Sequence, residues 1–174
     1  MKKHELLKSG DSILRVLDVQ EARVLVLDCV RRIMPYWTDN ASLEAYKPCS
    51  DDVLEPVDDI DSLDAEKRKT MYERYTVIAP ILPFIADNKL RSQLIAQAAK
   101  ENGLSRQTVR SYLCLYLAYM DISALAPKKQ KEDDNLSQDE KNMRWALNKF
   151  FYNKNKNSYY NRFMVDVPDN QPGS

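Results

Sequence analysis

Four polar residues in the middle of the chain have a spacing that could support DNA recognition. Arg106, Gln107, Arg110 and Ser111 share one side of any α-helix that contains them, because residues four apart lie one above the other. Arginine and glutamine form bidentate hydrogen bonds with the edges of guanine and adenine in the major groove. This helix face therefore predicts direct contact with base pairs.

Nearby basic residues could hold the DNA backbone. Lys89, Arg91 and Lys100 lie on or beside the preceding helical segment. Contacts from Lys and Arg to phosphates position a protein on DNA without reading its sequence, and we expect that role for these residues. Ser105, the expected N-cap of the helix that begins at Arg106, completes the predicted DNA-binding set.

Residues 95–112 have the spacing of a helix-turn-helix. Two helices that meet at a steep angle need a small residue at their contact, which Ala99 supplies. The tight turn needs a residue that tolerates positive φ, which Gly103 supplies. Ser105 would cap the second helix and Val109 would be buried against the first. All four residue types stand in the required register.

Composition favours binding over catalysis. The chain of 174 residues has 26 Lys+Arg and 26 Asp+Glu, but residues 1–66 contain 8 basic and 15 acidic residues, whereas residues 67–133 contain 12 and 6. A basic segment of this kind suggests a nucleic-acid partner. One histidine in the whole chain argues against His-based metal sites and Ser-His or Cys-His catalysis. We expect no catalytic residue, no metal ion and no cofactor.

The cysteines and the hydropathy pattern indicate the cellular compartment. Cys29, Cys49 and Cys114 are odd in number and form no CxxC pair, as is typical of proteins in a reducing cytoplasm. No window approaches the ~18 uninterrupted apolar residues of a membrane span. No apolar signal segment follows the N-terminus. These features predict a cytoplasmic protein without a membrane partner.

The apolar periodicity changes along the chain. Residues 12–17 and 23–28 predict a β-hairpin, and residues 33–38 predict a third strand. From residue 65 the apolar residues recur at three and four, which predicts helices, with Asp87 and Ser105 as N-caps. We therefore predict a mostly α fold with a small N-terminal β-meander and a three-helical helix-turn-helix unit, followed by the start of a second helical unit.

The same pattern predicts the domain organisation. It comprises a small β subdomain at 1–45, an acidic linker at 46–64, a helix-turn-helix DNA-binding domain at 65–126, a charged linker at 127–137 and a helical segment at 138–174 that could belong to a second DNA-binding unit.

Three parts of the chain together resemble a known family. They are the hairpin of residues 13–18 and 23–30, the end of the helix-turn-helix at 112–118 with its continuation to 127, and the segment Arg-Trp-Ala-Leu-Asn-Lys-Phe-Phe-Tyr at 144–152. Taken together they resemble the N-terminal region of Mu-type DDE transposases, the class that includes the B subunits of heteromeric transposition systems. The resemblance covers most of residues 10–160. The helix-turn-helix alone is generic, and the flanking segments point to this family.

The resemblance implies a partner and a location. In that family the N-terminal subdomains bind repeats at transposon ends, and a separate RNase H-like domain carries three metal-binding carboxylates. It implies double-stranded DNA at transposon ends and other transposition proteins as partners, and a bacterial, nucleoid-associated location. Such a catalytic core needs at least ~100 residues beyond Ser174, so we expect binding without strand transfer. Asp51, Asp58 and Glu66 lie in one polar segment and do not predict a catalytic triad.

Other functions remain open. The helical pair could pack on another protein and touch no DNA, which would make the chain a protein-interaction adaptor. A standalone helix-turn-helix transcription regulator would share the motif and form a symmetric dimer on two half-sites. The polar, basic face that begins at Arg106 favours DNA over the apolar surface that a docking protein needs.

Overall fold

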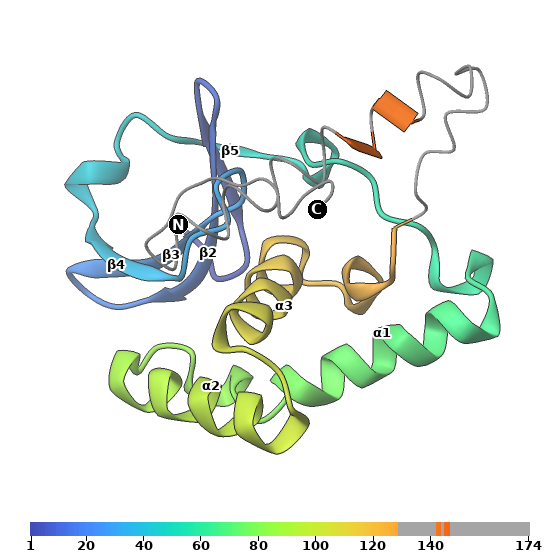
Figure 1. Cartoon of the computed structure of the whole chain (residues 1–174). Coiled ribbons are helices and arrows are strands. Elements are labelled where there is room, and N and C mark those ends of the chain that lie inside the picture. Colours follow the sequence, from blue (N-terminus) through green and yellow to red (C-terminus); the bar gives the residue numbers. More distant parts are fainter. Residues whose placement is uncertain (129–141, 144, 147–174) are drawn as a thin grey trace. The chain divides into compact units, whose positions relative to one another are not determined.

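Within the residues that the computed structural model describes (1–128, 142, 143, 145 and 146), the N-terminal part of the chain forms a five-stranded antiparallel sheet. The strand order is β4-β3-β2-β1-β5, so β5 returns to pair with β1 after the chain has left β4 at the opposite edge (Figure 1). The strands are β1 (Leu6–Ser9), β2 (Ser12–Val19), β3 (Arg23–Asp28), β4 (Tyr36–Asp39) and β5 (Lys47–Cys49).

Both faces of this sheet are buried. Leu25 of β3 packs in a core shared with the helices, whereas its neighbours Val24 and Val26 pack in a second cluster on the opposite face. Leu43, in the segment after β4, covers that second face. Strands that are buried on both faces have nearly continuous apolar sequences, which explains the lack of polar alternation in β2 and β3.

The helices follow the sheet along the chain. They are α1 (Ala65–Ile78), α2 (Asn88–Asn102) and α3 (Arg106–Tyr119). Asp64, Asp87 and Ser105 cap their N-termini, each with a side-chain oxygen that accepts a main-chain N–H three residues on. Short 3-10 helices connect the elements: η1 (Ala41–Leu43), η2 (Asp51–Val53), η3 (Ile60–Ser62), η4 (Leu82–Phe84) and η5 (Ile122–Leu125).

Helix α3 lies between the sheet and the other helices. It contacts β2 and β3 on one side and α1 and α2 on the other (Figure 1). Its side chains Val109, Leu113 and Leu117 are therefore almost fully buried. Residues 1–128 form one compact unit.

The predicted fold class is wrong. We expected a mostly α chain in which a small β-meander precedes a helix-turn-helix three-helical unit. Instead, an N-terminal sheet larger than a meander leads into helices that share its core. Strands β1 and β5 were missed because each is very short, and β5 contains Pro48, which is tolerated because β5 is an edge strand.

The segment predicted as an acidic linker, 46–64, carries structure. It contains β5 and two of the 3-10 helices described above, and Leu63 is buried in the core shared by sheet and helices. Ile60 and Leu54 pack partly against the same core. The carboxylates of this segment face solvent while its few apolar residues turn inward, which composition alone does not show.

The predicted charged linker (127–137) and helical segment (138–174) lie almost entirely outside the described residues. Residues 142, 143, 145 and 146 are helical, and residues 127 and 128 close the compact unit. In the part of the chain that the structure describes, no helix has the length and apolar character needed to cross a membrane.

Candidate nucleic-acid interface

The corner between α2 and α3 has the local geometry that the sequence predicted. Gly103 ends α2 in the left-handed conformation, with φ of +63°. Ser105 caps α3, and its Oγ accepts the N–H of Thr108 at 3.1 Å. Ala99 and Val109 are buried, at 5% and 0% exposure. These local predictions are confirmed, although the overall fold differs from the predicted one.

The outward face of the first two turns of α3 is polar and open. Arg106, Gln107 and Ser111 are exposed and Arg110 is half-buried. Within the described part of the chain, none of these side chains takes part in a hydrogen bond or an ion pair. The first turn of α3 contains no acidic residue. Its N-terminal partial positive charge therefore adds to the arginine charges.

Most other arginines are already engaged. The guanidiniums of Arg15, Arg68, Arg74 and Arg91 donate hydrogen bonds to main-chain carbonyls. Arg23 and Arg31 have neighbouring partners, Gln20 and Asp28 respectively. Among the arginines of the described residues, Arg32, Arg106 and Arg110 have no side-chain hydrogen bond or ion pair there. The basic character of residues 67–133 is thus partly internal, and the unengaged arginines are few.

Arg91 does not belong to the outward-facing set. It is only 6% exposed, and its Nη1 and Nη2 donate to the carbonyls of Ile85 and Pro35 at 2.7 and 2.9 Å. Burial lowers the pKa of this guanidinium. Arg91 therefore ties α2 to the chain that leads into β4, and a phosphate could not reach it.

The other predicted phosphate contacts remain accessible. Lys89 lies in the first turn of α2 and Lys100 in its last turn, and both are exposed. No ion pair within the described residues involves either ammonium group. Ser105 is occupied as the cap of α3 and fixes the start of that helix.

Sequence reasoning missed the side chain that fixes the other end of α3. Arg15 of β2 is buried at 3% exposure, and its Nε and Nη2 donate to the carbonyl of Ala118 at 3.0 and 2.8 Å. Its Nη1 donates to the carbonyl of His4 at 2.8 Å. Carbonyls in the last turn of a helix have no partner within the helix, so the Arg15 guanidinium satisfies one of them. Its positive charge also compensates the partial negative charge at the C-terminal end of the helix. The sequence does show an arginine among the apolar residues of β2, a position that indicates a buried cation with hydrogen-bond partners.

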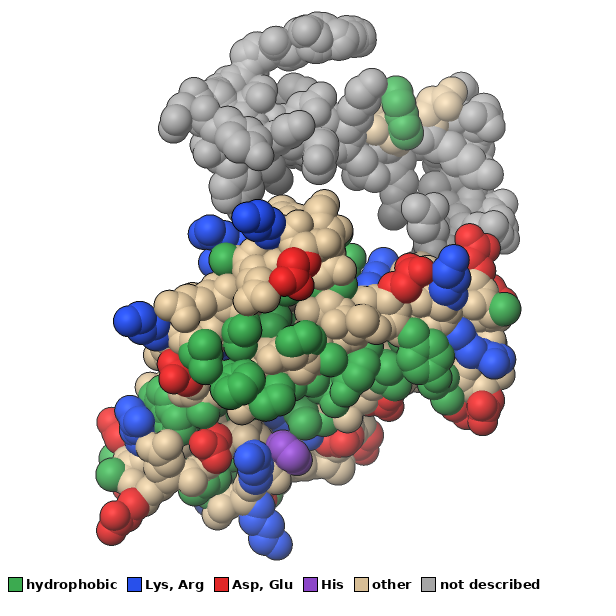
Figure 2. Space-filling view, turned by 90° about the horizontal axis from the view of Figure 1, so that it is seen from below, with side chains coloured by type: hydrophobic (Ala, Val, Ile, Leu, Met, Phe, Trp, Pro, Cys, Tyr) green, Lys and Arg blue, Asp and Glu red, His purple; other side chains and the backbone are tan. Residues whose placement is uncertain are grey.

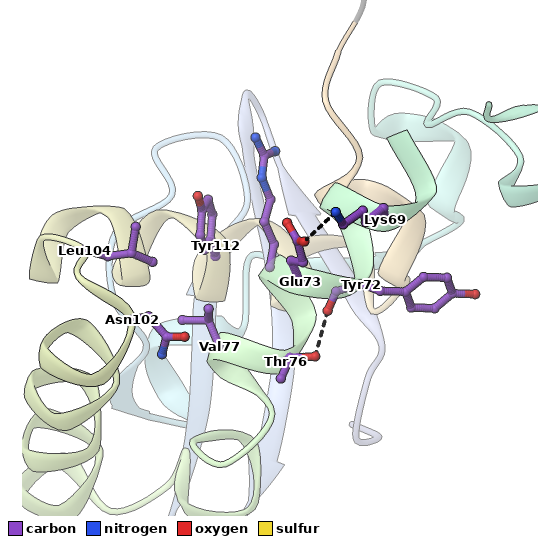
Figure 3. Close-up of a pocket in the computed structure, with 9 residues that line it drawn as sticks. Lys69, Tyr72, Glu73, Thr76, Val77, Asn102, Leu104 and Tyr112 are labelled. Carbon is purple, nitrogen blue, oxygen red and sulfur yellow. Dashed lines mark hydrogen bonds and ion pairs between the residues drawn. The ribbon is translucent and has the colours of Figure 1, made fainter. Parts of the chain in front are cut away.

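An open groove of about 640 Å³ lies where α1 faces the α2–α3 corner. Figure 3 shows Val77, Asn102, Leu104 and Tyr112 on one side of it, with the Tyr72 ring pointing away from them. The remaining lining residues are Lys69, Glu73, Arg74 and Thr76.

The charged groups of this groove are already paired. Lys69 and Glu73 form an ion pair at 3.9 Å, and Arg74 donates to the carbonyl of Leu125 while lying over the Tyr112 ring. The groove therefore offers a contact surface and no reactive group. Within the described residues, no group of three His, Cys, Asp or Glu side chains is placed to hold a metal ion.

The chain matches no protein-family model and no curated protein. The functional inference therefore depends on the residues of the α2–α3 corner and on the elements that hold them.

Proposed function

We propose that this chain is a non-catalytic, sequence-specific DNA-binding module that places the first two turns of α3 in the major groove. Arg106, Gln107 and Arg110 contact base edges, and Lys89 and Lys100 contact phosphates. The observation that carries the proposal is the face at the start of α3, whose donors are unengaged within the described residues although most arginines there are bonded.

The supporting physics is that of a rigid reading helix. A major groove admits an α-helix, and each good bidentate contact discriminates against the wrong base by about 1–3 kcal/mol. Such contacts need side chains on an element that does not move. Arg15 fixes the C-terminal end of α3 to the sheet, and Val109 and Leu113 bury its inner face.

The resemblance to Mu-type transposases suggests the target. We propose transposon-end DNA as the first duplex to test, other transposition proteins as further partners, and a cytoplasmic, nucleoid-associated location. Of that family's activities, we carry over only DNA binding, because the residues that resemble the family's DNA-contacting residues lie at the α2–α3 corner.

Selection from a random duplex library with the full chain tests the proposal. We expect one enriched motif, bound with an affinity that falls steeply as salt rises, because phosphate contacts release counterions. The double variant Arg106→Ala/Arg110→Ala should lose this binding. Lys8→Ala/Lys47→Ala is the matched charge control, since both lysines are exposed and lie opposite each other on β1 and β5, at the sheet edge away from β4. No enrichment, together with weak binding that is insensitive to salt, would overturn the proposal.

A protein-interaction adaptor is the second candidate function. Figure 2 shows a band of hydrophobic side chains on the face seen from below, with Lys and Arg side chains toward its margins. Tyr72 of α1 and Phe84 of η4 are 50% and 45% exposed. If added DNA leaves the amide resonances of residues 105–111 unchanged while a protein partner shifts those around Phe84, the adaptor function is the correct one.

A further inference from the structure

The connection between β3 and β4 presents an unusual surface. Its residues Val30, Arg31, Arg32 and Ile33 are all exposed, with the two apolar side chains at 59% and 46%. Exposed β-branched residues on either side of two arginines are neither a core segment nor an ordinary solvated loop. This segment, residues 30–33, is called the Arg31–Arg32 loop below.

The main chain of the Arg31–Arg32 loop is held in a defined turn. The Asp28 carboxylate accepts the N–H groups of Val30 and Arg31 at 3.0 and 2.8 Å, and the N–H of Arg32 donates to the Asp28 carbonyl at 2.8 Å. Arg32 has φ of +54°, the left-handed conformation that glycine adopts without cost and arginine does not. His4 and Met120 also have positive φ, and of the three Arg32 carries its charge on an exposed loop beside another arginine.

The loop is fixed against the middle of α3 and the first turn of α2. Its next residue, Met34, accepts a hydrogen bond from the Cys114 thiol of α3 at 3.7 Å. Pro35 accepts one from Arg91 of α2 at 2.9 Å. Cys114 lies one helical turn after Arg110, so the loop is anchored next to the side of α3 that carries Arg110.

Arg32 and Arg110 both lie near the Cys114 side chain of α3. Burial raises the pKa of the Cys114 thiol to about 11, and the nearby charges of Arg91, Arg32 and Arg110 act to lower it. Arg32 and Arg110 thus act on the same side chain. Together with Arg106, they are the arginines that lack a side-chain hydrogen bond or ion pair within the described residues.

We propose that the Arg31–Arg32 loop is a second DNA-reading element, which enters the minor groove next to the major groove occupied by α3. The proposal rests on the proposed DNA-binding function and extends the site from α3 to the sheet. The site read by the chain is then composite, with a core read by Arg106, Gln107 and Arg110 and a flank read by Arg32.

The chemistry of the loop fits a minor groove better than a row of phosphates. Arginine is drawn into the narrow, strongly negative minor groove of A·T-rich DNA. Apolar side chains in minor-groove binders wedge between base steps. A loop that contacted phosphates alone would give the apolar side chains of Val30 and Ile33 nothing to pack against. We therefore expect an A·T preference at the flank of the motif.

Arg32→Gly is the decisive variant, because glycine keeps the main chain and removes only the side chain. The full-length variant should unfold at the same urea concentration as the wild type, or a higher one. Its affinity for the duplex enriched by the wild-type chain should fall about tenfold. Lys47→Ala, which removes one positive charge from the far edge of the sheet, should change the affinity much less.

Repeating the selection with Arg32→Gly identifies what the loop reads. We expect the core of the motif to persist and the flanking A·T preference to disappear. Unchanged affinity and motif would overturn the loop proposal. So would weaker binding with every base preference intact, since the loop would then contact phosphates only.

The outcomes separate this inference from the proposed function. If the wild type enriches a motif and Arg106→Ala/Arg110→Ala loses binding while Arg32→Gly does not, only the loop inference fails. If the wild-type chain enriches no duplex, both fail.

Discussion

Replacing Arg15 by methionine removes the guanidinium that joins β2 to the end of α3. The Arg15 side chain is buried, and the Ala118 carbonyl accepts hydrogen bonds from its Nε and Nη2 at 3.0 and 2.8 Å. The His4 carbonyl accepts another from Nη1 at 2.8 Å. Methionine preserves much of the apolar stem but leaves both carbonyls without these donors.

The expected loss in the free energy of unfolding is large. A hydrogen bond from a charged donor contributes about 1.5–3 kcal/mol, and a buried acceptor left unpaired costs about 1–3 kcal/mol. Part of this loss in stability is offset, because the variant no longer has to desolvate a buried cation on folding. We expect a net loss of about 2–4 kcal/mol, against a total stability of about 5–15 kcal/mol for a domain.

Urea unfolding measures this loss. Trp37 and Trp145 are the tryptophans of the chain, so a Trp145→Phe background leaves Trp37 as the fluorescent reporter. Its indole N–H donates to the Ala86 carbonyl at 3.2 Å, which places the probe at the contact between β4 and the helices. Far-UV circular dichroism follows the helices, and both signals should shift together to lower urea.

Arg23→Met is the matched control. Arg23 lies on the neighbouring strand, is exposed, and contacts Gln20 and the Trp37 ring. Its loss should cost no more than ~1 kcal/mol, the usual contribution of an exposed cation–π contact. A loss below ~1 kcal/mol for Arg15→Met, or separate transitions for Trp37 fluorescence and circular dichroism in the wild type, would refute the view that Arg15 holds sheet and helices in one unit.

Three further changes test other parts of the structure. Gly103→Ala should cost about 1–2 kcal/mol, because only the left-handed main chain opposes the new methyl group, and urea unfolding should show a smaller loss for Gly103→Asn. Arg91→Ala should destabilise the fold measurably in urea, whereas Lys89→Ala should weaken DNA binding at unchanged stability. Burial raises the pKa values of the Cys29 and Cys114 thiols from 9.0 to about 11. The native state then keeps protons that the unfolded chain releases, so the free energy of unfolding should fall as pH rises from 9 to 11. The fall should be smaller in the variant Cys29→Ala/Cys114→Ala.

Local rules predicted the α2–α3 corner correctly. A glycine that ends a helix, a serine that caps the next one and a small residue at the contact act within a few residues, so the sequence shows them directly. Gly103, Ser105 and Ala99 occupy the expected positions for this reason.

Non-local pairing was not predictable in the same way. Strand β5 pairs with β1 across some forty residues, and neither strand is long enough to have a pattern of its own. Arg91 and Arg106 illustrate the same limit for charges. Both are arginines in a helical segment, but the tertiary fold buries the first and exposes the second.

The central claim is that the start of α3 reads bases. The most direct test measures the affinity of the wild type and of Arg110→Ala for the enriched duplex and for each of its single-base-pair variants. We predict that Arg110→Ala loses about 1–3 kcal/mol of binding free energy on the enriched duplex and no longer discriminates at one base pair. An equal loss on every duplex would show that Arg110 contacts only phosphate and would contradict the claim.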